Sequence, residues 1–222
     1  MRIIASFYKH EQVMFVSHLD MQRLFQRAFR RADLPLAYSN GFNPHPLLSF
    51  ATALSVGYTS DCEYFDVMLS EYVSPAEFKR RVNAVLPQGV HIVDAVDAGE
   101  FKASLTPLMR SAEYDIELEF AESVPREAFY VAVDEILNGG EIIVSKKTKG
   151  GIKDVDIRPM LLGLSISEFG GRTAKLRLRG KLTAEGGLSP ELLLGAFYKK
   201  LGTSANSSVN RRNIEMDWTV IA

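Results

Sequence analysis

The chain has 222 residues, of which 46% are hydrophobic and 24% charged, a length that suits one large domain or two small ones. Its 26 basic and 27 acidic side chains give a formal charge of -1, which leaves no net field to draw the whole protein onto nucleic acid or membrane. Because Cys62 is the only cysteine, the sequence excludes an internal disulfide, a cysteine-rich zinc site and an iron–sulfur cluster.

The first half of the chain alternates strand and helix signals. The runs 3–8 and 13–16 are β-branched and aromatic, which predicts an opening strand or hairpin. Ser17 then supplies the N-cap of a helix that extends to about Ala32 and carries its apolar residues on one face. The remaining elements are two strands, a helix that opens at Ser74-Pro75, and a last strand, expected at 47–54, 63–69, 74–86 and 90–96.

The second half repeats this order after a stretch without periodicity. Strands are expected at 112–120, 141–148, 154–167, 172–182 and 209–221, and helices at 125–137 and 189–201. We therefore predict an α+β protein of two ferredoxin-like (βαββαβ) halves, each an antiparallel sheet with helices on one face. The predicted domains are 1–98 and 109–222, joined by a linker at 99–108.

Charge is distributed unevenly along the chain. Residues 94–135 hold eleven acidic and only three basic side chains, so a polyanion would avoid this segment. The expected strand at 172–182 carries four alternating cations that could form an RNA-binding face: Lys175, Arg177, Arg179 and Lys181. We favour a structural interpretation, in which they form cross-strand ion pairs with the acids of the neighbouring strand: Glu113, Asp115, Glu117 and Glu119.

Two other groups of cations are candidates for a polyanion site. The helix expected at 17–32 carries Arg23, Arg27 and Arg31 one turn apart, which could follow successive phosphates or form an ordinary solvated face. The second group surrounds Gly150-Gly151, where a hairpin tip could hold an RNA backbone. It consists of Lys146, Lys147, Lys149, Lys153 and Arg158.

Three of the four histidines lie in the first 45 residues, close to two turns. A functional interpretation joins the helix start to the proline-rich loop as an anion site, in which His18 and His45 act as general acid and base. Its residues are Ser17, His18, Asp20, Gly41, Phe42, Asn43 and His45. The residue types alone favour a structural alternative, with Ser17 as a cap, Asn43 in an Asx-turn and His45 packed between prolines. A metal site is not expected, since no closely spaced ligand pair occurs.

Four segments carry a family resemblance: FVSHLD at 15–20, ADLPLAYSNGFNPHP at 32–46, LSFA at 48–51 and KDVDIRP at 153–159. Together with the arginine-rich helix they resemble the radical-SAM-linked family DUF2344, whose members are uncharacterised. The resemblance covers nearly the whole chain. It implies a domain that stands beside, or is fused to, a B12-binding-type radical SAM protein, and a role in RNA maturation. With Cys62 as its only cysteine, the chain lacks the three-cysteine motif and would be the partner of the radical enzyme.

Our first hypothesis is a non-catalytic cytoplasmic module, without cofactor or metal, that holds a tRNA or rRNA for a radical SAM partner. Phosphates would lie along the arginines of 17–32, and Phe42, Asn43 and His45 would contact an unpaired base. No membrane association is expected, because no apolar run approaches the ~20 residues of a span and the first residues are typical of a strand rather than a signal peptide.

Two alternatives from other classes stay open. The first is a metal-independent endoribonuclease that uses His18 and His45. The second is a protein-interaction scaffold whose acidic surface at 94–135 docks the radical SAM protein. The sequence does not decide whether the chain is an enzyme, although the first hypothesis needs no catalysis by the chain itself.

Overall fold

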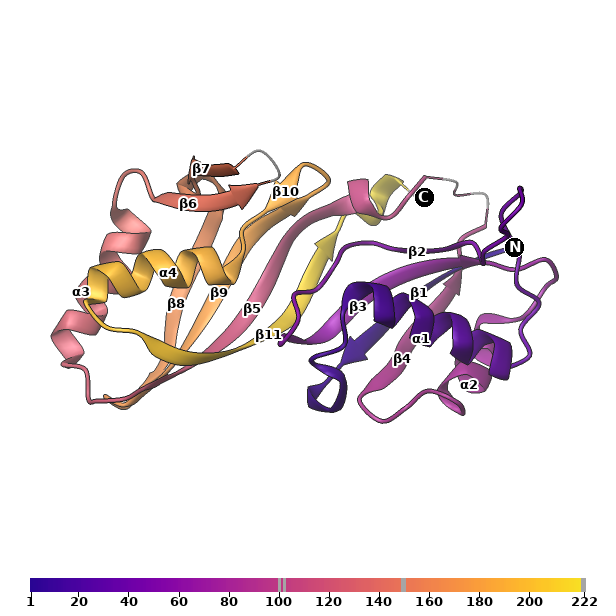
Figure 1. Ribbon diagram of the computed structural model, residues 1–222, viewed down its shortest axis with the longest axis horizontal. Helices are drawn as coiled ribbons and strands as arrows, with labels where there is room; N and C mark the ends of the chain where they lie inside the picture. Colours follow the sequence, from indigo (N-terminus) through magenta and orange to yellow (C-terminus); the bar gives the residue numbers. More distant parts are fainter. Residues whose placement is uncertain (100, 102, 149–150, 221–222) are drawn as a thin grey trace. The chain divides into compact units, whose positions relative to one another are not determined.

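Figure 1 shows the computed structural model, which describes residues 1–99, 101, 103–148 and 151–220, with the backbone alone at 147, 148 and 220. The chain divides into two compact units, Met1–Met109 with Met216–Ala222 and Arg110–Glu215. Each unit contains strands and α-helices, so the α+β fold class is confirmed.

The first unit is an antiparallel sheet with the strand order β4-β1-β3-β2. Its elements follow the chain as β1 (Arg2–Lys9), α1 (His18–Arg31), β2 (Leu48–Phe50), β3 (Thr59–Met68), α2 (Pro75–Asn83) and β4 (Val90–Asp97). Phe7 of β1, Phe65 of β3, Phe25 and Phe29 of α1, and Phe78 of α2 belong to one buried cluster. Both helices therefore cover the same face of this sheet, which fixes the opposite face of α1 toward solvent.

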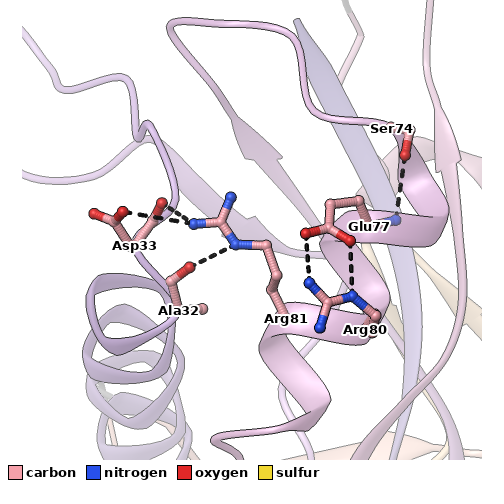
Figure 2. Close-up of polar contacts among 6 residues, drawn as sticks. All are labelled: Ala32, Asp33, Ser74, Glu77, Arg80 and Arg81. Carbon is pink, nitrogen blue, oxygen red and sulfur yellow. Dashed lines mark hydrogen bonds and ion pairs between the residues drawn. The ribbon is translucent and has the colours of Figure 1, made fainter.

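The two helices of the first unit are tied together by Arg81 of α2, as Figure 2 shows. Its guanidinium donates to the carbonyl of Ala32 at 2.8 Å and to that of Asp33, at the end of α1. Asp33 adopts a positive φ of 51°, so the chain leaves α1 through a left-handed residue. Arg81 thus satisfies carbonyls that a helix C-terminus leaves without a partner, and it holds α1 in place against α2.

The second unit contains β5 (Met109–Phe120), α3 (Arg126–Asn138), β8 (Leu161–Phe169), β9 (Thr173–Thr183), β10 (Gly186–Gly187), α4 (Pro190–Leu201) and β11 (Ala205–Met216). Its strands follow the order β11-β5-β9-β8, with the short β10 also on β9. Phe129 of α3 meets Phe197 of α4 at 5.5 Å and Phe120 of β5 at 6.2 Å, which joins the helices to the sheet. A separate hairpin of β6 (Ile143–Thr148) and β7 (Gly151–Asp156) forms a two-stranded sheet.

Apart from shifted element ends and the 3₁₀ turn Arg158–Met160 that interrupts the segment expected at 154–167, three segments differ from the sequence-based expectations. The strand expected at 13–16 is absent: Glu11–Val13 is a 3₁₀ turn, and the chain bends so that the carbonyls of Met14 and Val16 reach the ammonium of Lys9. The last strand ends at Met216 and is followed by a 3₁₀ turn; residue 221 of the expected strand lies outside the described residues.

The third segment is the expected linker at 99–108, whose described part belongs to the first unit. Leu105 and Leu108 are buried, and Arg2 donates to the carbonyls of Phe101 at 3.0 Å and Ala103 at 2.8 Å. The lack of periodicity in this segment reflects irregular packed structure.

The contacts of Arg81 predict that Arg81→Ala lowers the free energy of unfolding by about 1.5–3 kcal/mol, because two carbonyls lose a charged donor. Urea denaturation followed by circular dichroism measures this loss. Arg80→Ala is the matched control, since Arg80 is exposed and its side chain pairs, among the described residues, only with Glu77 one turn away. We expect a much smaller loss for the control, and equal losses would contradict the role assigned to Arg81.

Candidate nucleic-acid interface

The start of α1 is fixed by a set of short polar contacts. The hydroxyl of Ser17 accepts a hydrogen bond from the Asp20 amide at 3.2 Å and donates to the Asp20 carboxylate at 2.7 Å. The other carboxylate oxygen accepts from Arg23 at 2.9 Å. The hydrogen bond from Ser17, followed by that from Arg23, lowers the pKa of Asp20. The role of Ser17 as N-cap is confirmed, and Asp20 stays ionised beside it.

His18 lines a small pocket of the first unit together with Lys9 and Glu63. Its ring meets the ring of Phe50 edge-on, with 5.5 Å between the centroids. The pocket residues come from β1, β3 and the segments around α1 and β2, and none of the described residues that line it belongs to the loop 38–46. The structure therefore does not bring His18 and His45 together in this pocket.

Lys9 is a site residue that the sequence interpretation missed. It is 3% exposed, and its ammonium donates to the carbonyls of Met14 and Val16 at 3.0 Å each. Burial lowers the pKa of Lys9, and the nearby carboxylate of Glu63 acts in the opposite direction. Strand alternation could have revealed it, because Lys9 continues the inward series of Ile3, Ala5 and Phe7 in β1.

The loop 38–46 is held together mainly at its base. Tyr38 and Pro46 form an isolated β-bridge, and the amide of Ser39 donates to the carbonyl of His45 at 2.9 Å. The Ser39 hydroxyl also lies 2.9 Å from Nδ1 of His45 and accepts from its amide at 3.1 Å. At the tip, Gly41 has a φ of +115°, and Phe42 and Asn43 are exposed. The loop thus presents a bare phenyl ring to solvent.

The arginines of α1 fall into two groups. Arg23 pairs with Asp20, and Arg31 donates to the carbonyl of Val85 at 2.7 Å. Arg27 is exposed, as is Arg30, and no hydrogen bond or ion pair joins either side chain to the described part of the chain. The cations that stay available for an anion therefore include Arg30, which the stripe predicted from the sequence left out.

Three of the four cations on β9 are paired with acids of the chain, and the fourth, Lys181, lies opposite Ser111 in the register. The antiparallel register of β5 and β9 places Asp115 opposite Arg177 and Glu117 opposite Lys175, with N–O distances of 3.1 and 3.3 Å. Arg179 pairs with Glu215 at 2.6 Å. The predicted cross-strand ion pairs are thus confirmed at two positions. They also count against the use of this acidic face as a docking scaffold.

The hairpin of β6 and β7 carries the second group of predicted cations. Lys146 lies directly opposite Lys153 and both are exposed. Lys147 pairs through its backbone with Ile152, but its side chain lies outside the description, as does the whole of Lys149. The hairpin therefore places two like charges side by side, an arrangement that lowers its own stability.

Arg158 has a structural role at the base of this hairpin. Its guanidinium donates to the carbonyl of Leu137, in the last turn of α3, at 2.7 Å and to that of Leu161 at 3.4 Å. One oxygen of Asp156 accepts from the amides of both Ile142 and Arg158 at 2.9 Å. The segment 153–159 singled out in the sequence thus fixes the junction of α3, the hairpin and β8.

The described residues lack two kinds of feature. No helix among them combines the length and the apolar character that a bilayer span requires. Within the same ranges, the potential His, Cys, Asp and Glu ligands form no group of three or more that could hold a metal ion.

The geometry thus defines an α+β protein in which Arg27 and Arg30 of α1 and Lys146 and Lys153 of the hairpin are exposed and make no side-chain hydrogen bond or ion pair in the described residues. Residues 2–190 match the family model described as "Uncharacterized protein conserved in bacteria (DUF2344)", and the chain belongs to this family. No curated protein matches the sequence.

Solved structures of similar fold include chains from ribonucleoprotein assemblies. One is in the crystal structure of a Cbf5-Nop10-Gar1 complex, with a TM-score of 0.56, 12% identity, and coverage of 96% of this chain and 48% of that one. A second is in the archaeal box H/ACA sRNP Nop10-Cbf5 complex (TM-score 0.51, 13% identity, 94% and 46% coverage). A third is in an H/ACA RNP bound to a substrate RNA containing 2'-deoxyuridine (TM-score 0.54, 12% identity, 96% and 47% coverage). The chain spans about half the length of these relatives, and the likeness concerns the fold.

The cap geometry predicts that Ser17→Ala raises the pKa of Asp20 toward its ordinary value, because the Ser17 hydroxyl is the largest cause of the lowered pKa. A lowered pKa in the folded state stabilises the fold above the unfolded-state pKa, and this contribution is lost as pH falls through the folded-state pKa. The stability gap between wild type and Ser17→Ala should therefore narrow on acidification. NMR titration of the Asp20 carboxyl measures the shift. Ser17→Thr, which keeps the hydroxyl, should behave like wild type, and an unchanged pKa in Ser17→Ala would refute the assignment.

Proposed function

We propose that this protein binds RNA, such as a tRNA or rRNA, through the solvent face of α1. The observation that carries the proposal is the availability of Arg27 and Arg30, which are exposed and without a partner in the described ranges. By contrast, Lys175 and Arg177 of β9 are paired with carboxylates. A guanidinium that makes no hydrogen bond or ion pair within the chain is free to replace a counterion on a phosphate.

The fold comparisons support an RNA partner. The similar chains come from structures described as H/ACA ribonucleoproteins, one of them bound to a substrate RNA. Identities of 12–13% are too low to transfer any residue's role.

We extend the proposal to the loop 38–46 and to a protein partner. The fully exposed ring of Phe42, with Asn43 and His45 beside it in the chain, would contact an unpaired base while α1 holds the backbone. The resemblance to radical-SAM-linked proteins supports a radical SAM enzyme that receives this RNA. Cys62 is the only cysteine, so the cluster of such an enzyme would have to belong to the partner. A cytoplasmic location belongs to the same proposal.

We further propose that both units are ferredoxin-like and arose by duplication. In chain order, each has four principal strands and two helices, arranged as strand, helix, strand, strand, helix, strand. The strand order β11-β5-β9-β8 of the second unit corresponds to the order β4-β1-β3-β2 of the first unit. The inserted hairpin of β6 and β7 is the main departure from this correspondence.

The proposal predicts that replacing Arg27 and Arg30 together by alanine weakens RNA binding about tenfold at low salt. The slope of log affinity against log salt should also fall by roughly 1.4 to 1.8, which corresponds to two lost phosphate contacts. Fluorescence anisotropy with a labelled tRNA and a labelled single strand, titrated with salt, measures both quantities.

The matched control removes two exposed cations of the second unit, Lys199 and Arg212, which also have no partner in the described residues. We expect this double alanine variant to bind RNA like wild type. Wild-type protein without salt-dependent RNA affinity, or equal losses in both variants, would contradict the proposal.

A further inference from the structure

The second unit contains a pocket that has no part in the proposed RNA site on α1. It has a volume of about 560 Å³ and lies where β5, β8, β9 and β11 meet the turn of Arg158–Met160. One side is apolar and is formed by Pro159, Met160 and Leu162. Pockets of this size with mostly apolar walls and a few polar groups are typical of small-ligand sites.

The apolar side of the pocket is built by the segment 153–159 and its continuation. Asp156 and Arg158 fix this turn through the hydrogen bonds to Ile142, Leu137 and Leu161 described above. Pro159 and Met160 follow directly, and Leu162 leaves 46% of its surface exposed. This hydrogen-bonded turn therefore holds hydrophobic side chains at an open pocket.

The polar side of the pocket carries two cations and two carboxylates, which differ in whether they are paired. Lys181 is exposed, and its ammonium has no partner among the residues that the structure describes; Arg110 lines the same pocket. Glu215, which also lines it, accepts from the Ser111 hydroxyl and pairs with Arg179 at 2.6 Å; these two contacts, followed by the charge of Arg110, lower its pKa. Of the lining acids, only Glu185 lacks such a partner in the described ranges. An occupant with one flat apolar part and one anionic group fits this distribution.

We infer that the pocket binds one unpaired nucleotide of the RNA, with the base against Pro159, Met160 and Leu162 and a phosphate at Lys181 and Arg110. This inference rests on the proposed RNA-binding function and places a specific nucleotide subsite in the second unit. The exposed pair Lys146 and Lys153 supports it, because their hairpin leads directly into the pocket wall. A bound phosphate backbone would relieve the repulsion between these two like charges.

NMR of the full-length protein tests the subsite with AMP as the probe. The ring current of a bound base should shift the methyl signals of Met160 and Leu162, whereas ribose 5-phosphate should leave them unchanged and adenosine should bind more weakly than AMP. Met160→Leu identifies the methionine signal. Unmoved methyls with AMP would overturn the inference. So would a shift produced only by a short acidic peptide with leucine side chains, which would make the pocket a protein-docking site.

Binding of a single-stranded RNA of about ten nucleotides separates this inference from the proposed function. Leu162→Gln should lower the affinity about tenfold with an unchanged salt slope, and Lys181→Gln about threefold with a reduced slope. Ile152→Gln is the control, since Ile152 is 78% exposed on β7 and lies outside the pocket. Equal thermal stability of all variants verifies folding.

The outcomes are distinguishable. If wild type binds RNA and the Arg27/Arg30 variant loses affinity, but Leu162→Gln and Lys181→Gln bind like wild type, the nucleotide subsite is refuted and the proposed function stands. If wild type shows no salt-dependent RNA binding, the proposed function fails and the subsite fails with it.

Discussion

The pairing of β5 with β9 determines which cations of the second unit are available to an anion. Its register sets Asp115 against Arg177 and Glu117 against Lys175, so that a strand rich in cations is balanced by its neighbour. A shift by one residue would turn these side chains to the opposite face and separate the pairs. Because this register pairs Lys175 and Arg177 with acids of the chain, the cations left for a polyanion include those on α1, those on the hairpin and Lys181 near the end of β9.

In helix α1 of the first unit, internal contacts determine which charged side chains remain available to a ligand. Six residues of α1 and its cap make polar contacts or carry exposed charge, and their roles differ: Ser17, Asp20, Arg23, Arg27, Arg30 and Arg31. Arg23 completes the cap through Asp20, and Arg31 secures the chain near Val85, so both already have partners. Arg81 reaches across from α2 and keeps the helix end fixed. The exposed face around Arg27 is therefore presented by a rigid support, which lowers the entropy cost of binding.

Periodic residues made much of this fold predictable. The cap at Ser17, the Ser74-Pro75 helix start and the alternating charges of β5 and β9 each depend on neighbours in the chain or on one strand pair. The turn at Glu11–Val13 and the packed segment before β5 depend on contacts that no local pattern encodes. The burial of Lys9 follows the alternation of β1, but its carbonyl partners are brought close only by folding. Likewise, Arg158 was predicted as an anion ligand, whereas its partners are carbonyls from α3 and β8, brought close only by folding.

The juxtaposition of Lys146 and Lys153 has a consequence for how the second unit responds to ionic strength. Screening by added electrolyte weakens an attraction such as that between Arg177 and Asp115, yet it also relieves the repulsion between two ammonium groups on one ribbon. A higher ionic strength therefore weakens the ion pairs between β5 and β9 and stabilises the β6–β7 hairpin. The two parts of a single unit then have opposite dependences on electrolyte, and a multivalent anion would reinforce the ribbon at concentrations too low to disturb the sheet.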